Sequence, residues 1–190
     1  MPGDPLSQGT LIWSGEHWLN YLRRPGADTD SALLSLYHAH YSAGGEGTVA
    51  FVDIPGRFTG ACTNSREFAR FIIETMIRGS GNPFDCDMPL LDATLERSGD
   101  VRTAPCCTIQ TPDHRIASTW SGLQEPLVGP PTINKYIVFT VFCFADQGSI
   151  VFDGRNVEGR PYPREGWRQN LGEPGSSSMF ALAETMIQPS

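Results

Sequence analysis

The residues best suited to chemistry in this sequence are Asp53, His40 and Tyr21. A carboxylate that projects into an apolar pocket has a raised pKa, because burial disfavours its charged form, and it can then act as a general base. An imidazole on an apolar face can act as a general acid or base, and a phenol can donate a hydrogen bond to a developing oxyanion. Each residue also has a purely structural interpretation: Asp53 as a cap of the Pro55–Gly56 turn, His40 as a hydrogen-bonded core residue and Tyr21 as a packed ring.

The sequence offers little for metal ligation or covalent catalysis. His38 and His40 are two residues apart, and on the helix expected there they point to different sides, whereas a helical metal pair needs a spacing of three or four. His17 and His114 lie in other segments, so we expect no metal site and no cofactor. A Schiff base would have only Lys135 as its carrier, and the chain contains no nucleophile elbow, phosphate-binding glycine loop or dinucleotide fingerprint.

Further residues are candidates for the lining of a substrate pocket. Aromatic side chains are the normal lining of a pocket for an apolar ligand. Asp153 and Arg155, two apart on an expected strand, project to the same side, and their alternative role is a solvated ion pair at the rim of the sheet. The candidates are Tyr37, Tyr41, Trp18, Trp120, Phe139, Asp153 and Arg155.

Composition and charge exclude several classes of function. A formal charge of −7 argues against a nucleic-acid groove, which needs clustered lysine and arginine. No apolar run approaches the length of a membrane span, and the polar start from Met1 to Gly9 lacks the features of a signal peptide. The five cysteines form no C-x-x-C pair and are interpreted as small buried residues of a reducing compartment. We therefore expect a soluble, cytoplasmic protein with no nucleic-acid or membrane partner.

Periodicity and turn signals predict helices early in the chain and a meander of strands later. Apolar residues recur at helical spacing in 14–23, 30–41, 64–76 and 179–187. The third of these begins with Asn64 and Glu67, which have capping-box spacing. Strands are expected at 48–54, 57–60, 89–97, 104–111, 115–121, 136–144 and 149–157, with a turn at 146–148 and a loop over 159–178. Helices grouped before a strand meander indicate an α+β fold.

Stretches of the chain resemble the nuclear-transport-factor-2-like superfamily, and within it the ketosteroid isomerases and SnoaL-like polyketide cyclases. They are 21–37, two helical segments broken at Gly26-Ala27-Asp28; 49–56, which ends in Asp-Ile-Pro-Gly; 60–71, a glycine followed by a helix with Phe; and 138–150, a strand with an Asp-Gln-Gly turn. The resemblance runs from about Glu16 to Val157. It implies a cone-shaped, curved antiparallel sheet wrapped on N-terminal helices, with a pocket on the concave face.

The resemblance also implies roles for individual residues. Asp53 lies at the position of the proton-abstracting aspartate and Tyr21 at that of the oxyanion tyrosine. Ile137 stands where the isomerases have a protonated aspartate, which argues against steroid isomerisation. The family's organisation implies one domain over 10–158, with 159–190 as a pocket lid or an oligomer contact, in a homodimer or homotrimer.

Together these observations predict a cofactor-free lyase, dehydratase or isomerase. It would act by acid–base chemistry on a small hydroxylated or carbonyl-bearing aromatic or polycyclic substrate, with Asp53 or His40 as the base and Tyr21 or Tyr41 as the donor. Water-eliminating or carbon–carbon cleavage of an aromatic compound needs the same base-and-donor pair. A non-catalytic small-molecule binding module and a polyketide cyclase are the alternatives, because this fold hosts all of these functions.

Overall fold

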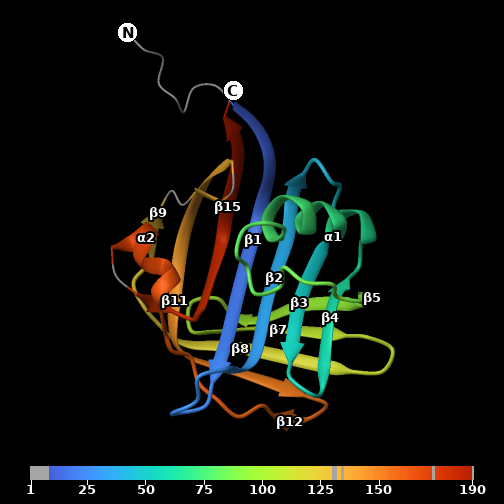
Figure 1. The fold of residues 1–190 in the computed structure, drawn as a ribbon, viewed down its shortest axis with the longest axis vertical. Coiled ribbons are helices and arrows are strands. Elements are labelled where there is room, and N and C mark those ends of the chain that lie inside the picture. Colours follow the sequence, from blue (N-terminus) through green and yellow to red (C-terminus); the bar gives the residue numbers. More distant parts are fainter. Residues whose placement is uncertain (1–8, 130–131, 134, 173, 190) are drawn as a thin grey trace.

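The computed structural model describes residues 9–129, 132–133, 135–172 and 174–189, and it consists mostly of β-strands (Figure 1). In the described part, thirteen strands form one sheet, with a main path in the order β5-β4-β3-β2-β1-β15-β11-β8-β7-β6. These strands are β1 (Gly9–Arg23), β2 (Asp30–Ser42), β3 (Thr48–Ile54), β4 (Phe58–Thr63), β5 (Leu90–Asp92), β6 (Thr94–Asp100), β7 (Ala104–Gln110), β8 (Arg115–Leu123), β11 (Tyr136–Phe152) and β15 (Ser178–Pro189). The short strands β9 (Leu127–Gly129), β10 (Thr132–Ile133) and β12 (Arg155–Asn156) pair with β11, whereas β13 (Pro163–Arg164) pairs with β14 (Gly175–Ser176) in a separate hairpin.

The first strand of the chain lies in the middle of this sheet. β1 pairs antiparallel with β2 on one side and with the last strand, β15, on the other. Along the main path the pairing is antiparallel throughout, except between β4 and β5. Two register shifts interrupt the pairing of β1 with β2, one of them between Ser14 and Gly15. Such bulges bend a strand and increase its twist, and this one lies next to the candidate site described below.

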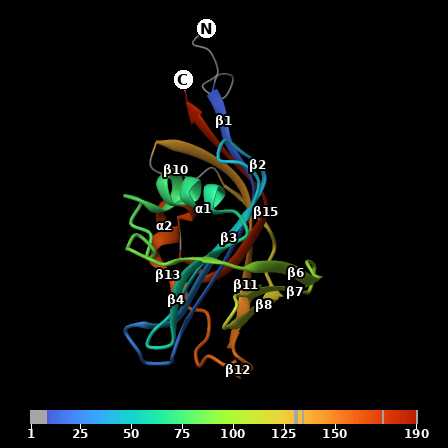
Figure 2. The ribbon, with the colours of Figure 1, turned by 90° about the vertical axis from the view of Figure 1, so that its right-hand side faces the viewer.

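The sheet curls strongly, so that strands β6, β7 and β8 come to face the strands of the other half (Figure 2). One buried core lies inside this curl. Leu34 of β2 and Val52 of β3 belong to the same cluster as Ile109 of β7 and Trp120 of β8, although these strands lie in different halves of the path. The buried side chain of Asn20 adds hydrogen bonds from β1 across the curl, to the Ser118 hydroxyl of β8 at 2.8 Å among others. The curl is therefore closed by packing rather than by pairing of its edges.

A second core covers the opposite face of β1, β2 and β3. It lies beneath α1 (Arg66–Ile72) and the π-helical turn η1 (Ile73–Ile77), and buries Phe68 and Ile72 of the helix together with Phe51 of β3. Farther along this face, η2 (Glu165–Trp167) and α2 (Arg168–Leu171) bring Trp167 onto Phe142 of β11, with ring centroids 5.1 Å apart. The segment 159–178, which was predicted to be a loop, thus covers part of the sheet.

The structure contradicts the predicted α+β cone with N-terminal helices. The segments 14–23 and 30–41, expected as helices, are the central strands β1 and β2, and 179–187 belongs to β15. The reason is burial on two sides. A strand between two cores has apolar residues on both faces, so the alternation that marks a half-exposed strand disappears and helical spacing can be matched by coincidence. In β1, every residue from Gly15 to Leu22 is buried.

Other predicted elements are confirmed within a few residues. β3 has the predicted bounds, β7 and β8 match closely, and α1 with η1 covers most of the helix expected over 64–76. Its N-cap is Ser65 rather than Asn64, because the Ser65 side chain accepts the hydrogen bond from the backbone of Phe68. The turn expected at 146–148 is absent, since β11 runs without a break through these residues. Within the described chain, no helix has the length and apolar character that crossing a bilayer requires.

Candidate metal site

Three metal-ligating side chains converge where β1 and β2 pair. Glu16 of β1 lies opposite His38 of β2 in the strand register. Because side chains two apart on a strand project to the same side, His40 joins His38 there, and the two rings lie 5.5 Å apart. One ligand atom from each of the three residues lies within 4.8 Å of the others. The earlier argument against a His38–His40 pair assumed a helix, and it does not hold on a strand.

Each of these side chains is also held by another contact. Trp18 donates its indole N–H to Glu16 Oε2 at 2.9 Å, and Glu16 Oε1 lies 3.3 Å from His40 Nε2. A hydrogen bond of 2.8 Å joins His38 Nδ1 to the hydroxyl of Thr48, which leaves Nε2 as the ring nitrogen for a ligand. Such outer contacts fix the orientation of ligating side chains in known metal sites. The group is thus oriented by its surroundings.

An arginine from the far edge of the sheet completes the cluster. Arg97 of β6 forms an ion pair with Glu16 Oε1, the same oxygen that faces His40. The curl of the sheet brings the two together, since β6 ends the path that has β1 near its middle. The Arg97 side chain keeps 37% of its surface exposed, against 12% for Glu16. The ion pair therefore joins a largely buried carboxylate to a partly exposed guanidinium.

The electrostatics of the cluster favour the ligating forms of its residues. Burial raises the pKa of Glu16, but hydrogen bonds from Arg97 and Trp18 outweigh it, and the pKa lies below its usual value. Burial and the nearby Arg97 charge lower the pKa of His38, with Glu16 acting in the opposite direction. A carboxylate and a neutral imidazole are the forms that bind metal ions. Both residues therefore stay in these forms over a wider range of pH than free side chains do.

A hollow of about 400 Å³ opens beside this cluster. Glu16, Trp18 and Arg97 contribute to its wall, so the carboxylate and the guanidinium face a space that can hold a small molecule. The remaining wall comes from β6, the turn after it and β15, and consists of Leu95, Ser98, Gly99, Val101 and Leu182. Of the three clustered side chains, Glu16 is the one that lines the hollow. Two imidazoles and one carboxylate are the protein ligands of many catalytic zinc and non-haem iron sites.

The structure does not bring the three predicted catalytic residues together. Tyr21 is buried in the helix-covered core, and its hydroxyl has no hydrogen-bond partner. Asp53 is one position beyond Val52 on β3 and accepts a hydrogen bond from the Thr59 hydroxyl at 2.7 Å. His40 lies on the other side of the sheet from Tyr21, with Glu16. Only His40 therefore belongs to the cluster, and the roles proposed for Asp53 and Tyr21 stay predictions without a shared site.

The predicted pocket-lining residues are also dispersed. Trp18 and Trp120 lie in the core inside the curl, with ring centroids 5.2 Å apart, and Trp18 alone reaches the hollow beside Glu16. Tyr37 is in the helix-covered core, whereas Tyr41 is exposed. Phe139 is half-buried on β11.

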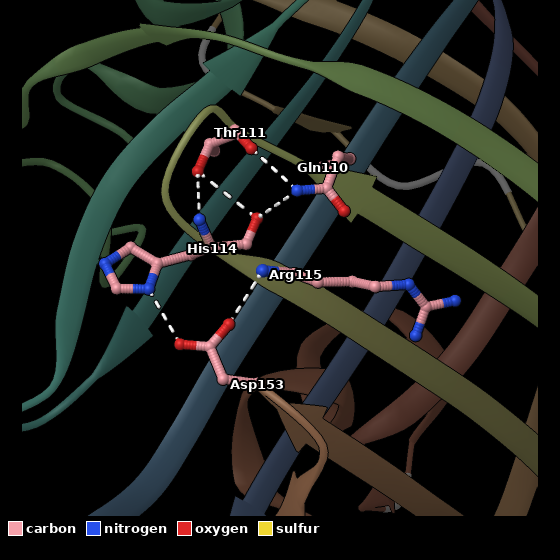
Figure 3. Close-up of polar contacts among 5 residues, drawn as sticks. All are labelled: Gln110, Thr111, His114, Arg115 and Asp153. Carbon is pink, nitrogen blue, oxygen red and sulfur yellow. Dashed lines mark hydrogen bonds and ion pairs between the residues drawn. The ribbon is translucent and has the colours of Figure 1, made fainter.

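Asp153 and Arg155 do not form the predicted pair. Asp153 lies in the turn between β11 and β12, where its carboxylate accepts from the Arg115 backbone N–H at 2.8 Å and contacts His114 Nδ1 at 2.8 Å (Figure 3). Its φ of 49° is in the left-handed region, which aspartate tolerates better than most residues. The network continues through the His114 carbonyl to Gln110 and Thr111. These contacts stabilise the turn between β7 and β8 and link it to the turn between β11 and β12. We therefore interpret them as structural.

A second polar group lies buried on the helix-covered face. His17 Nε2 is 3.2 Å from the Ser35 hydroxyl, His17 Nδ1 is 3.7 Å from Glu184 Oε1, and the imidazole stacks on Tyr37 at 4.3 Å. The order of carboxylate, imidazole and hydroxyl is that of a nucleophile triad. Ser35 has no exposed surface, however, and its position in the middle of β2 offers no approach for a substrate. We interpret the group as buried polar packing, in which His17 bonds Ser35 and lies near Glu184 Oε1, an atom without a hydrogen bond of its own.

Sequence reasoning missed Glu16, Arg97 and Thr48. One signal was available, because His-x-His is a ligand pair on a strand although it is not one on a helix. Comparison with protein-family models, with curated proteins and with solved structures gave no match. The resemblance to the nuclear-transport-factor-2-like superfamily is therefore neither supported nor excluded by relatives, while the fold that it implied is the one corrected above.

Proposed function

We propose that this protein binds a divalent transition-metal ion through Glu16, His38 and His40 and presents it to a small molecule in the adjoining hollow. The observation that carries the proposal is the convergence of the three ligand atoms within 4.8 Å. Nitrogen and carboxylate donors suit Zn²⁺ and neighbouring transition metals better than Ca²⁺ or Mg²⁺. A metal ion with an open position polarises a bound carbonyl or lowers the pKa of a bound water.

Arg97 is the residue that this proposal must accommodate. Its ion pair engages the same Glu16 oxygen that faces His40, so metal and guanidinium compete for one atom. The competition is compatible with binding, because a bound cation would replace the charge of Arg97 beside Glu16, and the Arg97 side chain keeps 37% of its surface exposed. Arg97 also lines the hollow, where its guanidinium can bind a negatively charged ligand. Its presence therefore favours an anionic ligand.

The acid–base lyase predicted from the sequence remains a second candidate on one observation. His40 is the predicted base that contacts Glu16, a residue that lines the hollow, and a metal-activated water or carbonyl would serve the same eliminations. A cytoplasmic location and a homo-oligomeric state stay predictions as well. All five cysteines are free thiols, which accords with a reducing compartment.

The test is direct titration of the full chain, without a histidine tag, with Zn²⁺ by calorimetry and with Co²⁺ by visible absorption. We expect His38→Gln and His40→Gln each to weaken binding by at least about tenfold, the effect usual for loss of a metal-site contact. His114→Gln is the matched control, because His114 lies in a distant turn bonded to Asp153. Equal affinity in all four proteins, or no binding by the unmodified chain at millimolar Zn²⁺, would overturn the proposal.

A further inference from the structure

The hollow beside Glu16 shares two wall residues with a second one. The second hollow has a volume of about 490 Å³, and Val101 and Leu182 line both. We call the two together the trough. Its polar end is at Glu16 and Arg97, and its other end passes over Val141 of β11 and Cys143. The trough therefore joins a site of metal-ligand chemistry to a surface of different character.

That other surface is apolar and open to solvent. Leu182, Val101 and Val141 are all among the large apolar side chains that remain exposed, at 38%, 44% and 40%. Neighbouring exposed apolar residues on one face mark a binding surface more often than single ones do. Burying such side chains contributes about 25 cal/mol per Å² of apolar area. An apolar ligand segment laid here would gain from contact with all three.

The charges along the trough differ between its ends. At the polar end, a bound divalent ion together with Arg97 exceeds the single negative charge of Glu16, and metal-bound imidazoles are neutral. The surplus of positive charge calls for an anionic group. In the second hollow the charged residues are Arg102, which is bonded to Asp100 at 3.3 Å, and Glu125. Their charges are opposite, so this end carries no comparable surplus.

We infer that the ligand of this site is an amphipathic carboxylate, with its carboxylate at the metal and Arg97 and its hydrocarbon part along Leu182 and Val141. The inference rests on the proposed metal site and names the class of molecule that it takes. Carboxylate and guanidinium match as a paired hydrogen-bonding unit, and the exposed apolar strip accounts for the tail. Val101 and Leu182, which line both hollows, place the polar end and the apolar strip side by side.

The probes are octanoate, acetate and octanol. Octanoate carries a carboxylate and a hydrocarbon tail, acetate carries the carboxylate alone, and octanol carries the tail without a carboxylate. With the Zn²⁺-loaded full chain in calorimetry, we expect octanoate to bind at least tenfold more tightly than either of the others. Leu182→Ser should weaken octanoate binding several-fold, and by a larger factor than it weakens acetate binding. Arg97→Gln should weaken the binding of octanoate and leave the binding of octanol unchanged. Leu11→Ser is the matched control, since Leu11 has the same residue type and nearly the same exposure, 39%, and lines neither hollow.

Two outcomes would overturn the inference. One is octanoate binding that is absent or is indifferent to Leu182→Ser. The other is a dimer in sedimentation that Leu182→Ser dissociates, which would assign the apolar strip to a second copy of the chain. The Zn²⁺ titration without octanoate separates this inference from the metal proposal. Zn²⁺ binding with no preference for octanoate removes the inference alone, whereas loss of Zn²⁺ binding removes the metal proposal itself.

Discussion

Glu16 and His38 lie directly opposite each other on β1 and β2, and a third side chain, Trp18, bonds the Glu16 carboxylate from the same strand. Cross-strand neighbours have Cβ atoms about 4.5–5.5 Å apart, close enough for both side chains to reach one ion. A metal site built in this way depends on strand register, because a slip of one residue would turn one ligand to the other face.

Trp18→Phe tests the contact that orients Glu16. The change removes the N–H that bonds Glu16 Oε2, and it also removes part of the ring volume that packs in the core. We expect Zn²⁺ affinity to fall by about tenfold or more, because outer contacts of ligands contribute this much in known sites. Trp120→Phe is the matched control: its N–H bonds the Leu19 carbonyl at 2.8 Å, so it should lower stability and leave Zn²⁺ affinity unchanged. Calorimetry and urea unfolding measure the two effects, and equal Zn²⁺ affinity in both variants would contradict the expectation.

Metal removal should lower stability by a calculable amount. A ligand that binds only the folded chain stabilises it by about 2.7 kcal/mol at a free concentration one hundred times its Kd. For a chain of this length that corresponds to a rise in Tm of roughly 5–10 °C. We expect EDTA to reverse the rise in the unmodified protein and to have a smaller effect in His40→Gln, because each tenfold loss of affinity removes about 1.4 kcal/mol of this stabilisation. Scanning calorimetry gives both, and a Zn²⁺ effect of undiminished size in His40→Gln would place the ion elsewhere.

The metal-free protein should lose stability in mild acid through His38. Its pKa is lowered in the folded chain, mainly by burial and then by Arg97, so the unfolded chain takes up the proton first. Above the ordinary histidine pKa of about 6.5 both states are neutral, and this group has no effect. As the pH falls below that value, stability is lost until the folded pKa is passed. Glu16 adds a loss of the same sign at lower pH, because its pKa is also lowered.

The measurement is urea unfolding in EDTA at several pH values between neutrality and the ordinary pKa of glutamate. His38→Gln should flatten the upper part of the curve and leave the lower part, which belongs to carboxylates. A curve that is the same with and without His38 would show that this imidazole does not titrate differently in the two states.

The sequence predicted best the elements whose pattern is local. In β7 and β8, buried residues alternate with half-buried or exposed ones. This alternation is typical of a strand with one solvent-facing side, and both strands were predicted. α1 was predicted from its apolar stripe. β1, β2 and β15 were missed because they lie between two cores, and a strand buried on both faces carries no period of two. The spacing of apolar residues in these strands was interpreted as a helical period. The predicted fold class was wrong for the same reason.

The same error concealed the site. His40 was identified as a chemical residue, but its pairing with His38 was rejected on helical geometry. Glu16 becomes a neighbour only through the β1–β2 register, and Arg97 only through the curl that brings β6 over β1. Register and curl depend on contacts between segments far apart in the chain. No local pattern in the sequence specifies them.

Gly15→Ala should disturb the pairing of β1 with β2 beside the proposed metal ligands. Gly15 is where the β1–β2 register shifts, next to Glu16, and a Cβ there would overlap the carbonyl oxygen of His38. Because that oxygen belongs to the backbone, the strands must separate, at a cost of about 1–3 kcal/mol or more. Gly56→Ala is the control, since nothing lies near its added Cβ and only its φ of 73° is unfavourable. We expect both variants to lower stability in urea unfolding, but only Gly15→Ala to weaken Zn²⁺ binding, because it alone moves Glu16 away from His38. Unchanged Zn²⁺ affinity in Gly15→Ala would mean that the ion does not depend on this register.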